Sequence, residues 1–128
     1  MAEATYPDDL KYHEEHDWAR VEGDQATFGI TWYAQDALGE VVFFDPPEVG
    51  SQVSKDQSYA EVESVKAVSD VFAPLSGEIV EVNAALDDSP EKVNQDPYGD
   101  GWMVKVRLSD PSEVDGLLDV EVYQRLLT

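Results

Sequence analysis

The sequence predicts a mainly β protein, a small sandwich of two antiparallel sheets with short flanking helices and a helical C-terminus. Three observations favour this fold class: the apolar runs have the length of strands, one run alternates between apolar and polar residues, and turn-forming residues separate the runs. The length of 128 residues favours a single domain over residues 1–128. We expect its core at about residues 11–108, followed by a helical segment at residues 110–128.

The strand-like runs lie throughout the central part of the chain. They occupy residues 26–30, 41–44, 59–62, 71–73, 78–82 and 102–108. Because successive side chains of a strand point to opposite faces, the last run predicts one buried and one solvated face. The expected buried residues are Trp102, Val104, Val106 and Leu108, and the expected solvated residues are Met103, Lys105 and Arg107.

Two places carry helix signals. Thr31 is a suitable N-cap for a short helix over residues 32–38, which Gly39 would end. Near the C-terminus, Asp110, Pro111 and Glu113 form an N-cap, a proline at the first helical position and an acid at the third. The apolar residues that follow predict helices covering an open end of the sheets; they are Val114, Leu117, Leu118, Tyr123, Leu126 and Leu127.

A short internal repeat suggests two similar β units. The sequence Gly-Glu-Val-Val at residues 39–42 recurs as Gly-Glu-Ile-Val at residues 77–80. Two such units related by a pseudo-two-fold axis would form a two-sheet sandwich. A tight hairpin holding residues 63–67 would then lie between the halves.

Composition and charge exclude several classes of function. The formal net charge is −20, from 28 acidic and 8 basic side chains, which disfavours binding to nucleic acid or to a membrane surface. The absence of cysteine excludes disulfides, thiolate zinc sites and a cysteine nucleophile. No apolar stretch has the length of a transmembrane helix, and the acidic start lacks the features of a targeting sequence. We therefore expect a cytoplasmic protein whose charge steers it to basic enzyme surfaces.

Lys66 is the lysine whose setting differs from the others. It lies between two strand-like runs and has the small or β-branched neighbours Val65 and Ala67. A hairpin tip would hold its backbone in place while its side chain extends into solvent. An enzyme that acylates a lysine requires this presentation, although most surface lysines are simply solvated.

The segment from Ser64 to Asp70 resembles the lipoyl attachment sequence of the glycine cleavage H proteins. The resemblance extends from about Lys11 to the end of the chain without large insertions. It includes residues 29–31, 33–35 and 38–40 in an early block, and residues 75–78, 82–83 and 94–102 in later blocks.

The resemblance implies a barrel-sandwich hybrid fold and a lipoyl carrier that is not itself an enzyme. It assigns Lys66 as the residue that bears covalent lipoic acid, flanked by Ser64, Val65 and Ala67. The carrier would accept the aminomethyl group of glycine from glycine decarboxylase and pass it to an aminomethyltransferase. Dihydrolipoamide dehydrogenase would reoxidise the arm, and lipoyl-attaching enzymes would be further partners.

The same resemblance implies a surface cleft that protects the loaded arm. In the family this cleft lies near a His-Glu-Trp motif and an acid after the attachment loop. Here the corresponding residues are His16-Asp17-Trp18 and Asp70, so Asp17 replaces the glutamate of the motif. A carboxylate beside the cationic amine would be favourable, whereas both acids could instead be ordinary solvated loop residues.

Other functions find less support in the residues. His13 and His16 are three positions apart, which differs from the spacing of the zinc-protease helix, and no third ligand is evident, so we expect no metal site. An enzyme is disfavoured because nucleophile and phosphate-binding motifs are absent. A biotin carrier is disfavoured because no methionine flanks Lys66. A lipoyl relay protein, or a lipoyl domain serving 2-oxoacid dehydrogenase complexes, remains the alternative.

Overall fold

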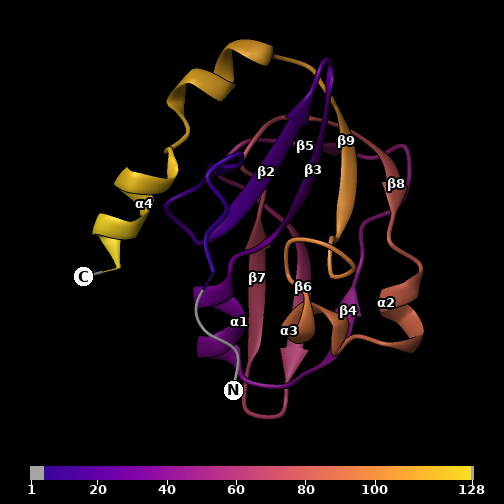
Figure 1. The fold of residues 1–128 in the computed structure, drawn as a ribbon. Helices are drawn as coiled ribbons and strands as arrows, with labels where there is room; N and C mark the ends of the chain where they lie inside the picture. Colours follow the sequence, from indigo (N-terminus) through magenta and orange to yellow (C-terminus); the bar gives the residue numbers. More distant parts are fainter. Residues whose placement is uncertain (1–4, 128) are drawn as a thin grey trace.

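The structure, a computed structural model, describes residues 5–127 and consists of two antiparallel sheets with short helices around them (Figure 1). Residues 1–4, in the acidic N-terminal segment, and residue 128, the last of the predicted domain, lie outside the described residues. The larger sheet contains, in spatial order, β1 (Lys11–Tyr12), β2 (Asp17–Glu22), β3 (Gln25–Ile30), β9 (Val104–Leu108), β8 (Gly77–Val82) and β5 (Gln52–Val53). The smaller sheet contains β4 (Val41–Asp45), β6 (Ser58–Ser64) and β7 (Val68–Phe72). This arrangement confirms the predicted fold class.

The main core lies between the two sheets. Phe28 and Ile79 of the larger sheet and Phe44, Val62 and Val71 of the smaller sheet belong to one buried cluster. Removing this apolar surface from water supplies the main driving force for folding. Both sheets are thereby held against each other, and the loops and hairpins at their ends have a rigid support.

Strand β9 is shorter than predicted, and one residue expected on its solvated face is buried. It begins at Val104, and Val104, Val106 and Leu108 are buried as the alternation predicts. Met103, which was expected on the solvated face, is fully buried. The prediction was wrong there because Met103 precedes the strand, donates its N–H to the Phe28 carbonyl and lies inside the core. Trp102 is only partly buried.

The helix after β3 matches its prediction. Helix α1 (Trp32–Leu38) begins after Thr31, whose side chain accepts the N–H of Ala34. It ends at Gly39, which has a φ of 80° and donates its N–H to the Gln35 carbonyl. The glycine therefore ends α1 with a backbone conformation that other residues rarely adopt.

The hairpin predicted at residues 63–67 is the β6–β7 turn, at the lower end of the molecule in Figure 1. The two copies of the repeat begin β4 and β8, which lie in different sheets. Their glycines are not equivalent, because Gly39 ends α1 whereas Gly77 lies in β8, where a Cβ would overlap the Arg107 carbonyl oxygen. The pseudo-two-fold relation stays a prediction.

The remaining helices are short. Helices α2 (Ala85–Asp88) and α3 (Lys92–Gln95) lie in the connection between β8 and β9. No helix within residues 5–127 is long and apolar enough to cross a membrane.

The C-terminal segment is helical but differs from its prediction. It forms a 3₁₀ helix, η1 (Pro111–Gly116), and then α4 (Val120–Leu126). Asp110 caps η1 as expected, but the Glu113 carboxylate accepts hydrogen bonds from the N–H and hydroxyl of Ser76, so it anchors the segment to a distant loop.

The segment also packs on a different surface from the one expected. Leu118 pairs with Tyr12, and Tyr123 stacks on the Tyr12 ring at 4.7 Å between centroids. The C-terminal segment therefore covers β1 at one side of the larger sheet (Figure 1), and Leu126 is 52% exposed. A second buried cluster of Leu10, Tyr12, Trp18, Tyr98 and Tyr123 forms there.

Candidate functional site

Lys66 occupies the tip of the β6–β7 hairpin. The Ser64 N–H donates to the Ala67 carbonyl at 2.8 Å, and the Ser64 hydroxyl oxygen accepts the N–H of Ala67 at 3.1 Å and of Lys66 at 3.3 Å. Val65 donates its N–H to the Glu40 carbonyl at 3.0 Å, which joins the tip to the segment after α1. These hydrogen bonds pair the backbone N–H groups of the turn with nearby acceptors, so the backbone of Lys66 is held in one position.

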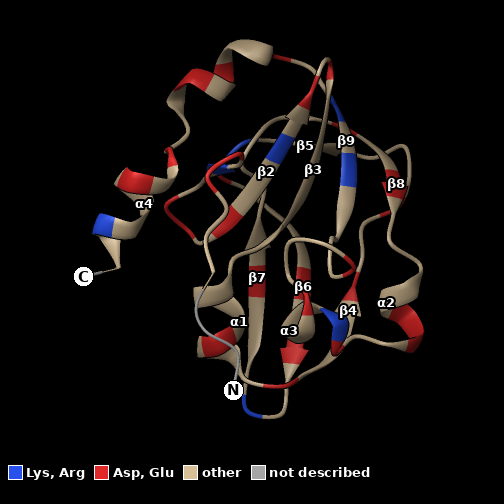
Figure 2. Ribbon diagram, in the orientation of Figure 1, with Lys and Arg blue, Asp and Glu red and all other residues tan. Residues whose placement is uncertain are grey.

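The Lys66 side chain is exposed and has no ion-pair partner within the described residues. Its Cε lies 3.5 Å from the position that a Cβ on Gly39 would occupy, so its stem passes over that glycine. Figure 2 shows the hairpin tip as a basic point on a chain that is otherwise rich in acidic residues. A modifying enzyme can therefore reach the Lys66 amine without rearranging the fold.

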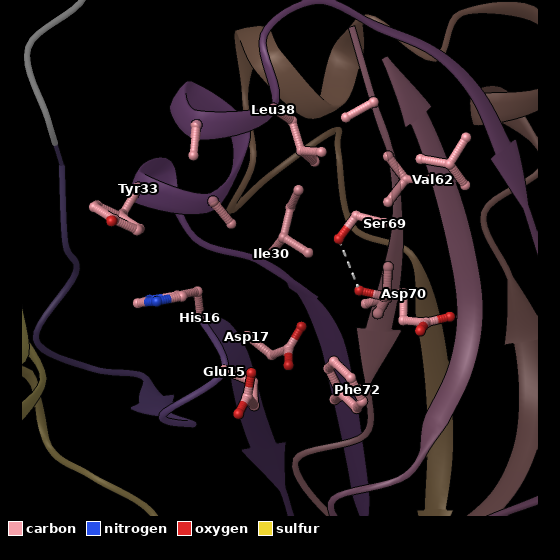
Figure 3. A pocket seen from close by; sticks show the side chains of 15 residues that line it. Glu15, His16, Asp17, Ile30, Tyr33, Leu38, Val62, Ser69, Asp70 and Phe72 are labelled. Atoms are coloured by element: carbon pink, nitrogen blue, oxygen red, sulfur yellow. Dashed lines mark hydrogen bonds between the residues drawn. The ribbon is translucent and has the colours of Figure 1, made fainter.

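A cleft of about 370 Å³ begins beside this tip (Figure 3). It runs between α1, β7 and the turn that precedes β2, and both Ala67 and Val68 contribute to its wall. Apolar walls come from Ile30, Leu38, Val62, Val71, Phe72, Ala34 and Ala37, and polar groups from Glu15, His16, Asp17, Tyr33, Ser69 and Asp70. The cleft thus combines apolar walls with acidic groups, which suits an apolar chain that ends in a cationic group.

Asp17 is the buried acid of this cleft. It is 1% exposed, and its Oδ2 atom has no hydrogen-bond partner among the described residues. Burial raises the pKa of the Asp17 carboxyl well above its usual range, and the charge of Glu15 raises it further. The reading of Asp17 as a solvated loop acid is therefore wrong, because this side chain is shielded from water and faces the cleft.

Asp70 lines the same cleft but is exposed and lies at its edge. In the register of the smaller sheet it is opposite Glu61, which is opposite Asp45, so these three acids share the outer face. The Ser58 hydroxyl donates to Asp70 Oδ1 at 3.2 Å. Figure 3 shows the Asp70 carboxylate on the side of β7 that faces away from Asp17. The structure therefore separates the two acids that the family motif places together.

His16 is held in the cleft wall by residues that sequence reasoning missed. Its backbone has a φ of 72°, its Nδ1 lies 2.8 Å from the Tyr123 hydroxyl, and its ring contacts that of Tyr33 at 4.5 Å between centroids. Burial lowers the pKa of the His16 imidazole, with a smaller opposing effect from Glu15. Tyr123 is far away in sequence, and no motif marks it. No group of three potential metal ligands occurs among residues 5–127.

Known proteins are similar to this chain in sequence over almost its whole length. The family model described as "Glycine cleavage H-protein" matches residues 10–128. The chain belongs to this family. It is 55% identical to the glycine cleavage system H protein of Symbiobacterium thermophilum and 56% identical to that of Halorhodospira halophila, and each comparison covers 94% of both chains.

A solved structure is also similar. The crystal structure of a glycine cleavage system H protein from Mycobacterium marinum superposes with a TM-score of 0.86 at 43% identity, covering 94% of this chain and 97% of the other. These comparisons confirm the family and the fold that the resemblance implied. They also confirm the function expected from it, that of a lipoyl carrier in glycine cleavage. The H protein is the carrier component of that system rather than a catalyst.

Proposed function

We propose that this H protein bears a lipoyl group on the Nζ atom of Lys66 and carries the aminomethyl group of glycine on that arm. One observation carries the proposal: an exposed lysine lies at the tip of a rigid hairpin, directly beside a cleft with apolar walls and a buried acid. Acylation would convert the ammonium into a neutral amide. The lipoyl dithiolane supplies the redox chemistry and the attachment point for the aminomethyl group.

The residues of the cleft fit such a group. Ile30, Leu38 and Val62 offer apolar contacts for the hydrocarbon part of an arm. The unpartnered Oδ2 of Asp17 offers an acceptor for an amine at the buried end. Because this oxygen is buried, a hydrogen bond to it would be stronger than one at the surface. The chain would thus bind and shield the loaded arm.

The hairpin residues would present the lysine. Ser64 holds the turn, while Val65 and Ala67 flank Lys66 without covering it. Gly39 leaves the space above α1 in which the lysine stem lies. We propose that Asp70, which is exposed at the edge of the cleft, adds to the negative field that attracts a cationic group, although its carboxylate faces away from Asp17.

The partners follow from the proposed role. They are glycine decarboxylase, an aminomethyltransferase, dihydrolipoamide dehydrogenase and the enzymes that attach lipoic acid. We propose one carrier domain over residues 1–128, and the cytoplasmic location stays a prediction. The alternative use of the same arm is a lipoyl relay, or service to 2-oxoacid dehydrogenase complexes.

Intact-mass measurement and peptide mapping test the attachment site. After expression with lipoate, we expect a lipoyl mass increment in the peptide that holds Lys66, and loss of the increment in Lys66→Arg. Lys11→Arg is the matched control, because Lys11 is also exposed but lies on the distant strand β1. A lipoyl increment on another peptide, or its persistence in Lys66→Arg, would overturn the assignment.

An exchange assay separates glycine cleavage from the relay. With purified glycine decarboxylase, the lipoylated protein should support exchange of bicarbonate into glycine, and Lys66→Arg should not. Transfer of lipoyl groups to a 2-oxoacid dehydrogenase, without any glycine exchange, would favour the alternative.

A further inference from the structure

His13 lies behind Asp17, between two carboxylates. Its Nε2 is 2.5 Å from Asp56 Oδ1, and its Nδ1 is 3.9 Å from Asp17 Oδ2. The His13 ring is buried, whereas the Asp56 side chain is 59% exposed. The three side chains therefore form a row that leads from the buried end of the cleft to solvent on another side of the molecule.

The hydrogen bonds around His13 define its tautomer. The Glu15 N–H donates to His13 Nδ1 at 3.1 Å, so this nitrogen is an acceptor and the ring proton is on Nε2. Nε2–H then donates to Asp56 Oδ1. In this tautomer the single lone pair on Nδ1 accepts the Glu15 N–H, and Asp17 Oδ2 lies 3.9 Å from the same nitrogen.

The backbone of Asp56 indicates that this contact is a built feature. Asp56 has a φ of 72°, a conformation that favours glycine, and its N–H donates to the Ala73 carbonyl at 2.9 Å. The hydrogen bond from His13 lowers the pKa of the Asp56 carboxyl, so Asp56 stays ionised beside the ring. An ionised partner stabilises a second proton on that ring.

Asp17 needs two different charge states in the proposed function. With the cleft empty, an unpaired buried carboxylate is unfavourable, so the carboxyl group holds its proton. A cationic amine in the cleft instead requires the carboxylate. We propose that His13, held by Asp56, is a positioning residue that takes the Asp17 proton when a cationic group enters the cleft. This inference rests on the proposed function, since the cationic group is the amine of the loaded arm.

The transfer balances within the three residues. The O–H bond at Asp17 Oδ2 breaks, its electron pair stays on the carboxylate, and an N–H bond forms at His13 Nδ1. The Glu15 N–H releases the Nδ1 lone pair, and the imidazolium donates from Nε2 to Asp56 as before. The Nδ1–Oδ2 separation must shorten by about 1 Å to reach hydrogen-bond distance.

Other charged groups act on this row. Glu15 and the ring of His16 are next to it on the turn before β2, and Lys55 is beside Asp56. The hydroxyl groups of Tyr59 and Tyr123 also feel the charge of Asp17. Of these neighbours, Asp56 is the one that is hydrogen-bonded to the His13 ring.

Carbon and nitrogen NMR titrations of the unlipoylated protein test the inference. We expect the titration of the Asp17 carboxyl to depend on the side chains of His13 and Asp56. His13→Gln should raise the Asp17 midpoint by about one pH unit, a tenfold gain in proton affinity. Asp56→Gly should raise it in the same direction, and this variant keeps the backbone because glycine accepts a φ of 72°.

Lys55→Gln is the matched control, because Lys55 neighbours Asp56 without contacting His13; the Asp17 midpoint should stay within a few tenths of a unit. An Asp17 midpoint unchanged in both His13→Gln and Asp56→Gly would show that His13 only braces the turn, and the inference would fail. This titration needs no lipoyl arm. A failure of Lys66→Arg to abolish lipoylation would therefore refute the proposed function and leave the proton coupling as a separate result.

Discussion

The Tyr123 hydroxyl lies 2.8 Å from the Nδ1 atom of His16, so the last helix reaches into the wall of the cleft. The same hydroxyl lies 2.8 Å from the Thr31 hydroxyl, which belongs to the N-cap of α1. One buried tyrosine therefore joins the C-terminal segment, the turn before β2 and the start of α1. The C-terminal segment thus supports the cleft, although none of its described residues lines the cleft wall.

Tyr123→Phe tests this support. The change removes one hydroxyl and leaves His16 and Thr31 without a shared partner, so the free energy of unfolding should fall by about 1–3 kcal/mol. Urea denaturation measures this loss. Tyr33→Phe is the control, because Tyr33 is 41% exposed and its hydroxyl has no hydrogen bond to a described residue. Equal stability of wild type and Tyr123→Phe would refute the role of the hydroxyl.

The strand pattern and the hairpin could be predicted, but the buried end of the cleft could not. Strand β2 was missed because its residues, Asp-Trp-Ala-Arg-Val-Glu, do not alternate between apolar and polar. The burial of Asp17 follows from its position at the start of that strand. Local sequence also cannot show that Tyr123 reaches His16, because this contact depends on how the whole C-terminal segment folds back.

The family motif points to Asp17 and Asp70 together, but it does not show that one acid is buried and the other exposed. Asp17 and Asp70 follow from the resemblance as partners at one site, and both do line the cleft. Their different exposure depends on strand register, which puts Asp70 in a row with Glu61 on the outer face. A shift of one residue in strand register would move a side chain to the opposite face of the sheet. The different exposure of Asp17 and Asp70 therefore cannot be predicted without the three-dimensional structure.

Asp17→Asn should change how stability depends on pH. Burial keeps the proton on Asp17 in the folded protein, whereas the unfolded chain releases it near the ordinary aspartate pKa of 3.8. The contribution of the protonated Asp17 to the free energy of unfolding is therefore fully present below pH 3.8. It is lost as pH rises toward the higher folded pKa, by about 1.4 kcal/mol for each pH unit between the two pKa values. Asparagine does not titrate, so the variant should lack this fall.

Urea denaturation at a series of pH values between about 3 and 8, which brackets the ordinary pKa and a raised one, measures the effect. Asp70→Asn is the control, because Asp70 is exposed and its removal should leave the pH dependence of wild type in place. In the loaded carrier, Asp17→Asn should also shorten the lifetime of the aminomethyl group. If the stability curves of wild type and Asp17→Asn stay parallel over this pH range, Asp17 does not hold its proton on folding.

Gly39→Ala should strain the connection between α1 and β4. Gly39 has a φ of 80° and a ψ of −161°, a region that is almost confined to glycine. We expect a loss of about 1–3 kcal/mol in the free energy of unfolding. The new Cβ would lie 3.5 Å from Lys66 Cε, an ordinary contact, so the loss should come from the backbone alone.

Gly23→Ala provides the comparison for Gly39→Ala. Gly23 has a φ of 65° in the β2–β3 turn, and no atom lies within 4 Å of its added Cβ. Its left-handed conformation is less restricted, so its cost should be smaller, about 1 kcal/mol. Thermal or urea unfolding of both variants measures the difference. A cost for Gly39→Ala no larger than that for Gly23→Ala would contradict the backbone argument.

Turnover with the partner enzymes should fall as salt increases. The net charge of −20 and the acidic row of Asp45, Glu61 and Asp70 near the Lys66 hairpin favour encounter with a basic enzyme surface. Ions screen this attraction beyond about 10 Å at 0.1 M salt. Replacing Glu61 with Gln should lower kcat/KM and weaken its dependence on salt, whereas Glu22→Gln, on β2 in the other sheet, should change both less. Screening becomes strong over roughly 20 to 300 mM salt. If kcat/KM stays constant over this range, charge does not guide the encounter.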